Sequence, residues 1–81
     1  MTTEADTMFY IAYIKHTQEW IAGDWRTVVE EYPFNGNGNS FEKPGTLINK
    51  TYKTRAAAER QARKRWNPAS VDAGYIQIIE V

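Results

Sequence analysis

Few side chains of this 81-residue chain have the types and spacing that catalysis or metal binding requires. His16 is the only histidine, and the chain has no cysteine, so the partners of a common metal site or nucleophile pair are missing. Glu30 and Glu31 should point to opposite faces of a strand, although carboxylate pairs formed by approach in space stay open. The run Gly36–Gly38 lacks the third glycine and the following helix of a phosphate-binding loop. The sequence therefore predicts no catalytic residue, no metal site and no cofactor.

Basic side chains are concentrated in the segment Lys50–Trp66, KTYKTRAAAERQARKRW, which has seven of them and one acidic residue. Thr54 suits an N-cap and the residues after it favour a helix, while the pair Asn67-Pro68 should end it. We therefore predict a helix over residues 54–67. Its apolar positions recur on one narrow stripe that should face the rest of the fold, at Ala58, Ala62 and Trp66.

The opposite side of this helix is the candidate binding surface. Together with two lysines that precede the helix, its members are Arg60, Arg63, Lys64, Lys50 and Lys53. Cations in the last turn stabilise a helix by about 0.3–1 kcal/mol each through their interaction with the helix dipole. Part of the basic pattern is therefore explained if this face is only exposed to solvent. Arg60 and Lys64 repel each other at i, i+4 spacing, so local stability does not explain every charge. A surface that contacts phosphate or an acidic partner is the second interpretation.

The formal net charge of zero conceals an uneven distribution along the chain. Residues 1–42 have two basic and seven acidic side chains, or −5, whereas residues 43–81 have eight basic and three acidic ones, or +5. Unless the fold mixes the two halves, the molecule should have one acidic and one basic side. The balanced total and a pI near 6.6 argue against a dedicated nucleic-acid binder.

Alternating apolar residues predict a sheet. The expected strands are 8–16, 25–32, 46–53 and 74–81. With the single helix, the order β-β-β-α-β indicates a two-layer α+β domain, in which a four-stranded, mainly antiparallel sheet has the helix packed on one face. We expect the first three strands to form consecutive hairpins. The last strand is strongly apolar, so we expect it beside the first and paired inside the sheet rather than at its rim.

Two tryptophans, Trp20 and Trp25, flank the turn expected at Gly23-Asp24. A tight turn would extend the first strand through Glu19–Ala22, whereas a wide loop would start at Thr17. If the tip of this hairpin protrudes, the tryptophans are exposed and suit the role of interaction anchors. The alternative is that they fold back onto the core.

The remaining segments are predicted from composition. Residues 1–7 should be a disordered tail, and residues 8–81 should form a single domain with a mobile loop at 33–45, rich in glycine and asparagine. No apolar run reaches the roughly 18 residues that a membrane span needs, and no targeting signal is evident, so a soluble cytoplasmic protein is expected.

These observations favour a small, non-enzymatic binding module whose partner is another protein, bound through a charged and aromatic surface. The alternative is a nucleic-acid-binding protein that uses the basic face of the helix at 54–67. The chain also resembles, in its small size and lack of cysteine and catalytic motifs, accessory proteins that phages and mobile elements encode. Such proteins often act by blocking or redirecting larger host machines.

Overall fold

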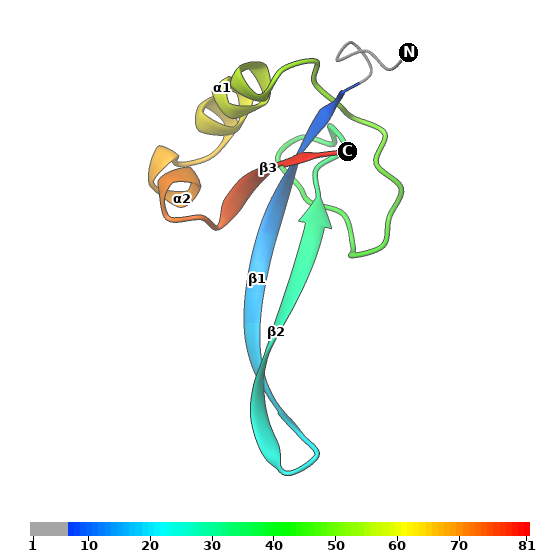
Figure 1. Cartoon of the computed structure of the whole chain (residues 1–81). Helices are drawn as coiled ribbons and strands as arrows, with labels where there is room; N and C mark the ends of the chain where they lie inside the picture. Colours follow the sequence, from blue (N-terminus) through cyan, green and yellow to red (C-terminus); the bar gives the residue numbers. More distant parts are fainter. Residues whose placement is uncertain (1–6) are drawn as a thin grey trace.

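The computed structural model describes residues 7–81 and shows an α+β fold with a three-stranded sheet and two short helices (Figure 1). Apart from Thr7, the predicted disordered tail lies outside the described residues. The elements in chain order are β1 (Phe9–Ile21), β2 (Asp24–Pro33), α1 (Arg55–Arg65), α2 (Pro68–Asp72) and β3 (Ile76–Glu80).

The sheet has the order β2-β1-β3, and both pairings are antiparallel. Tyr13 is paired with Tyr32 on one side and with Ile76 on the other, so β1 is the central strand. The last strand therefore lies beside the first, as expected. The expectation that it pairs inside the sheet is wrong: within the described residues no strand pairs with the other side of β3, so β3 lies at the rim.

The strand predicted at 46–53 is wrong. Only Tyr52 pairs with the sheet, through two main-chain hydrogen bonds with Phe9 of 2.9 and 2.7 Å. The reason is that β2 already occupies this side of β1 from Ala12 onward, which leaves one free position. The Asn35 side chain also binds the Leu47 carbonyl and the Asn49 N–H, and this holds the segment in an irregular path.

The predicted helix is present as α1, and its N-cap is Thr54, whose hydroxyl accepts a 3.1 Å hydrogen bond from the N–H of Ala57. The expectation of a single helix is wrong, because the short α2 follows directly. Asn67 caps α2 by accepting from the N–H of Ala69, and Pro68 stands at its first position. Proline suits a helix start as well as a helix stop, so the pair Asn67-Pro68 has both effects.

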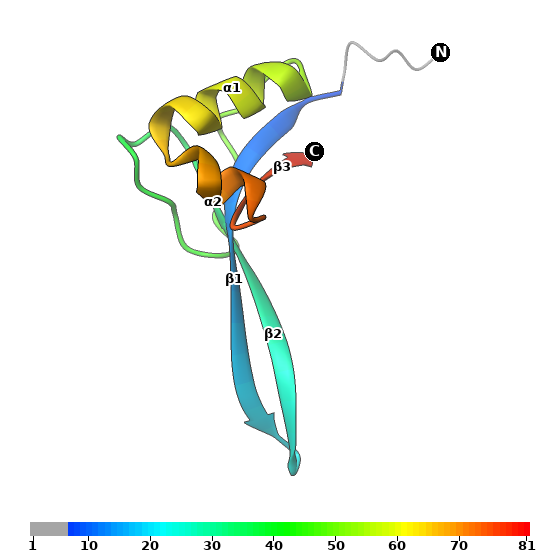
Figure 2. The same ribbon diagram turned by 90° about the vertical axis from the view of Figure 1, so that its left-hand side faces the viewer.

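One hydrophobic core joins the helices to the sheet. Its buried members are Ile11, Phe34, Ala58, Ala62 and Ile76, and Trp66 is half-buried against them. The two alanines let α1 lie close to β1 and β3, as their spacing predicts. The helices therefore cover one face of the sheet near its upper end, while the lower part of the β1–β2 hairpin extends away from them (Figure 2).

The mobility of the loop at 33–45, predicted from its glycine and asparagine content, stays a prediction, but the segment contributes buried side chains to the core. Phe34 is fully buried, and Phe41 packs against Trp66 with ring centroids 4.8 Å apart. The Trp66 indole N–H also donates to the carbonyl of Asn39 at 3.2 Å. Aromatic side chains from a glycine-rich segment thus complete the core of a chain too short to fill it from its regular elements.

Candidate functional site

The most prominent feature of the molecule is the part of the β1–β2 hairpin that extends beyond β3, which we call the arm (residues 15–30; Figure 1). Its tip is the two-residue turn Ala22-Gly23, because Ile21 pairs with Asp24. The turn is therefore tight, as one of the two alternatives predicted, but the predicted position at Gly23-Asp24 is wrong by one residue, and β1 ends at Ile21 and not at Ala22. Both turn residues have positive φ, 52° and 82°, as a type I′ turn requires. This turn matches the twist of the flanking strands and keeps their register up to the tip.

Trp20 and Trp25 are paired across the two strands of the arm, one position before the pair that closes the turn. Their ring centroids lie 5.4 Å apart with the planes at 74°, an edge-to-face arrangement that favours aromatic pairs. Each side chain is nevertheless 62% exposed. The two tryptophans therefore pack on each other and not on the core, and they form a rigid aromatic surface at the far end of the molecule.

The rest of the arm is held by cross-strand pairs that are exposed or only partly buried. Gln18 donates through its side-chain amide to the Thr27 hydroxyl at 2.8 Å. On the other face the register sets Lys15 opposite Glu30 and Glu19 opposite Arg26, so opposite charges are neighbours. The arm is thus an extension of the sheet that is held by main-chain pairing and cross-strand contacts, without a hydrophobic core of its own.

At the base of the arm, Tyr10 joins the two strands by donating its hydroxyl hydrogen to the carboxylate of Glu31. Burial, the hydrogen bond to Glu31 and the negative charge of Glu31 together raise the pKa of Tyr10 to about 12, and burial has the largest effect. The phenol is therefore a donor over the whole ordinary pH range. This contact fixes β2 against β1 where the arm leaves the core.

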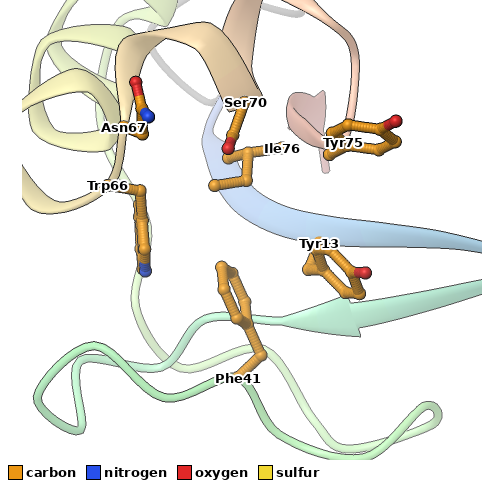
Figure 3. Close-up of a pocket in the computed structure, with 7 residues that line it drawn as sticks. All are labelled: Tyr13, Phe41, Trp66, Asn67, Ser70, Tyr75 and Ile76. Atoms are coloured by element: carbon orange, nitrogen blue, oxygen red, sulfur yellow. The ribbon is translucent and has the colours of Figure 1, made fainter.

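A hollow of about 410 Å³ lies between the base of the arm, the loop and the helices (Figure 3). Four aromatic rings contribute to it from separate segments, and the lining residues are Tyr13, Phe41, Trp66, Asn67, Ser70, Tyr75 and Ile76. Phe41 also contacts Tyr13, with centroids 5.7 Å apart. The volume lies in the range of about 300–1,000 Å³ that small ligands or buried partner side chains occupy.

The chemistry of the hollow is that of apolar binding. Its lining contains no carboxylate, histidine or basic side chain, and the Asn67 side-chain oxygen is engaged by the Ala69 N–H. The hollow was missed by the sequence analysis because Phe41 lies in a glycine-rich loop and Tyr75 in a turn. The surplus of aromatic residues in a short chain was the signal that pointed to such a surface.

The basic face of α1 is partly neutralised within the molecule. Arg63 contacts the carboxylates of Asp72, at 2.5 Å, and of Glu59, at 3.6 Å. The hydrogen bond to Asp72 raises the pKa of Arg63 most, and the negative charge of Asp72 raises it further. Arg63 therefore links α1 to α2. The sequence analysis could not predict this ion pair, because it did not predict α2.

The other predicted basic residues do not form one surface. Lys50 lies beside Gly36 of the loop, with its ammonium 5.3 Å from the Tyr52 ring centre, and Lys53 precedes the N-cap of α1. Arg60 and Lys64 are exposed on α1 and have no ion-pair partner among residues 7–81. Among the predicted basic residues on α1 itself, the two without an ion pair in the described chain are thus Arg60 and Lys64.

The two charge halves of the sequence are partly mixed by the fold. The arm has two basic and three acidic side chains, or −1, while residues 7–14 and 31–81 together have eight basic and five acidic ones, or +3. The mixing arises because Glu31 and Glu42 of the first half lie with the core and not in the arm, while Glu4 and Asp6 are outside residues 7–81. The separation between arm and core is therefore smaller than the sequence halves indicate.

The residues considered first for catalysis lie apart. His16 is exposed on the arm opposite Val29, and Glu30 and Glu31 are on opposite faces of β2, as predicted. Within the described chain, no three His, Cys, Asp or Glu side chains are grouped as a metal site would require. None of the helices formed by residues 7–81 has the length and apolar character of a membrane span.

Comparison with known proteins does not extend this description, since no protein-family model, no curated protein sequence and no solved structure matches the chain.

Proposed function

We propose that this protein is a non-enzymatic binding module that binds another protein through the arm, with Trp20 and Trp25 as anchors. The observation that carries the proposal is the exposure of both tryptophans, 62% each, at the tip of a projecting hairpin. Tryptophan is among the residues that most often dominate binding energy at protein interfaces. An anchor that is already held in one geometry also loses little conformational entropy on binding.

The shape of the arm supports the same proposal. A two-stranded hairpin without a covering layer is only marginally stable in water, so the arm adds little to the stability of the core. Its side chains carry both charges and a single histidine, which suits a mixed protein surface better than a phosphate backbone. The hollow beside Tyr13 and Trp66 is a second place where an apolar side chain of the same partner fits.

Nucleic-acid binding is the second candidate, and the observation that favours it is the exposed pair Arg60 and Lys64 on α1. Two free cations on one helix make a small electrostatic footprint, and binding through phosphate contacts falls steeply with salt. A fluorescence-anisotropy titration with generic DNA and RNA at rising salt tests this candidate. We expect weak binding that disappears near physiological ionic strength.

Affinity capture from the source organism tests the main proposal. The baits are the intact chain, the double variant Trp20→Ala with Trp25→Ala, and the matched control Arg60→Glu with Lys64→Glu. We expect one protein to be retained by the intact chain and the charge control, and its recovery to fall about tenfold or more with the tryptophan variant, since hot-spot truncations cost about 2 kcal/mol or more.

All three baits must unfold cooperatively, with thermal midpoints within a few degrees of one another, since neither pair belongs to the core. Equal recovery by the tryptophan variant would contradict the proposed role of the arm. Loss of the captured partner only with the charge control would instead favour the helix face.

A further inference from the structure

Among residues 7–81, no strand lies beside the outer edge of β2, because β2 is the first strand in the order β2-β1-β3. Phe34, just after β2, donates its N–H to the carbonyl of Ile11 at 2.8 Å, which shows that even-numbered residues here face β1. In an antiparallel ladder this direction alternates along the strand. The open main-chain groups on the outer side are therefore those of Trp25, Thr27, Val29 and Glu31.

One end of this edge is closed and the remainder is open. Pro33 has no N–H to leave unpaired, and its carbonyl accepts a 2.7 Å hydrogen bond from Glu42 of the loop. Among residues 7–81, this is the only main-chain hydrogen bond from outside the hairpin that reaches the outer side of β2. The stretch from Trp25 to Glu31 is thus free to pair with another strand.

Natural proteins protect open edges with charged side chains, above all lysine, and with proline or bulges. The charges of β2 are of both signs, Arg26 and three carboxylates, so they can attract a second strand as well as repel one. β2 contains no lysine, its register with β1 runs without a bulge, and its proline stands at the end. Its centre is the β-branched run Thr27–Val29, and Val29 is 57% exposed. Such an edge is suited to strand addition.

The charges of β2 select its own copy as the added strand. When two antiparallel β2 strands are centred on Val28, Arg26 of each copy lies opposite Glu30 of the other, and Thr27 lies opposite Val29. Centring on Thr27 sets Asp24 opposite Glu30, and centring on Glu30 sets that residue opposite itself, so both registers are repulsive. Centring on Val29 creates no charge pair.

We propose that two copies of this chain associate through their β2 strands, paired antiparallel and centred on Val28, to form one continuous six-stranded sheet. The interface is isologous, as a twofold dimer requires, so each attractive charge pair occurs twice. It covers the unprotected edge and gives each two-stranded arm a third and fourth strand. The pairing uses main-chain groups of β2 and does not depend on the protein partner proposed above.

Sedimentation equilibrium of the intact chain over a wide concentration range is the first test. We expect a concentration-dependent rise from the mass of one chain to the mass of two. Arg26→Glu and Glu30→Arg, each alone, should weaken self-association about tenfold or more, because both charge pairs become repulsive. Arg60→Glu is the control, since it makes the same change of charge as Arg26→Glu on the exposed side of α1, away from this edge, and it should dimerise as the intact chain does.

Mixing the two charge variants is the decisive measurement. In the mixed pair, the carboxylate introduced at position 26 of one copy lies opposite the guanidinium introduced at position 30 of the other. The second attractive pair is the native one, between Arg26 and Glu30, so we expect dimers of one copy of each variant to be restored. The variants carry the same charge mismatches within their own hairpins, opposite Glu19 and Lys15, whether alone or mixed.

Because these internal mismatches do not change on mixing, arm stability cannot explain a restoration. A monomeric intact chain, or a mixture no more dimeric than its components, would overturn the proposal.

Discussion

Single side chains decide how firmly the arm is fixed to the rest of the molecule. Tyr10 crosses from β1 to Glu31 on β2 where the sheet narrows to two strands, and Arg63 joins α1 to α2 through Asp72. Both contacts link elements and not neighbouring turns of one element. The tryptophan pair is different, because Trp20 and Trp25 contact each other and leave most of their surface to solvent.

The contact of Tyr10 predicts a pH dependence. The folded state raises the pKa of this phenol from about 10 to about 12, so folding favours the protonated form. Its contribution to the free energy of unfolding is complete below pH 10 and is lost as the pH rises toward 12. Chemical denaturation at several pH values should show this loss in the intact chain and a smaller one in Tyr10→Phe. An unchanged pH dependence in the variant would show that another group is responsible.

At the scale of elements, the turn of the arm is not the one that its sequence would favour most. Ala22 has a φ of 52°, a left-handed conformation in which a Cβ is unfavourable, whereas Asn-Gly is the preferred pair for a type I′ turn. The pairing of the two flanking strands therefore determines the turn, and Ala22 adopts an unfavourable left-handed backbone conformation to form it.

Replacing Ala22 tests this interpretation. We expect Ala22→Asn to stabilise the arm by about 0.5–1 kcal/mol, seen as slower hydrogen exchange of arm amides and little change in global unfolding. Gly23→Ala is the matched opposite change. Its added Cβ meets nothing within 4 Å, so the expected loss of about 1 kcal/mol comes from the backbone alone. Faster exchange in Ala22→Asn would contradict the type I′ assignment.

On the scale of the whole molecule, the fold divides into a core and an extension. The core cluster, with the half-buried residues packed against it, contains no side chain from residues 15–30. The principal extents of 47, 35 and 22 Å reflect this division. The arm is therefore a projection from a small core in which the helices pack on the sheet.

This division predicts that the core folds without most of the arm. Replacing Gln18–Thr27 with Asn-Gly joins Thr17 to Val28, a pair in the same phase of the ladder as the native closing pair Ile21 and Asp24. We expect the helical signal to be retained and the thermal midpoint to change by only a few degrees, because a loss of about 1 kcal/mol shifts it by about 4–8 °C. Loss of the cooperative thermal transition would show that the arm belongs to the folding unit.

The sequence by itself determined the features that depend on neighbours along the chain. The cap at Thr54 and the buried stripe of Ala58 and Ala62 follow from short-range geometry and side-chain chemistry. A tight turn between the first two strands was one of two interpretations, and its position was predicted one residue too late. The same reasoning identified the apolar last strand beside β1. Such features need only the period of a helix or strand and the preferences of its end residues.

Only the tertiary structure decided which of these surfaces are free. The segment before Tyr52 does not form a strand, because β2 pairs with that side of β1. Arg63 is not free, because it pairs with Asp72 of α2, a helix that the sequence did not predict. The exposure of Trp20 and Trp25 depends on how far β1 extends past β3. The exposure of a side chain depends on which segments, distant along the chain, pack against it, and a local sequence pattern does not determine this.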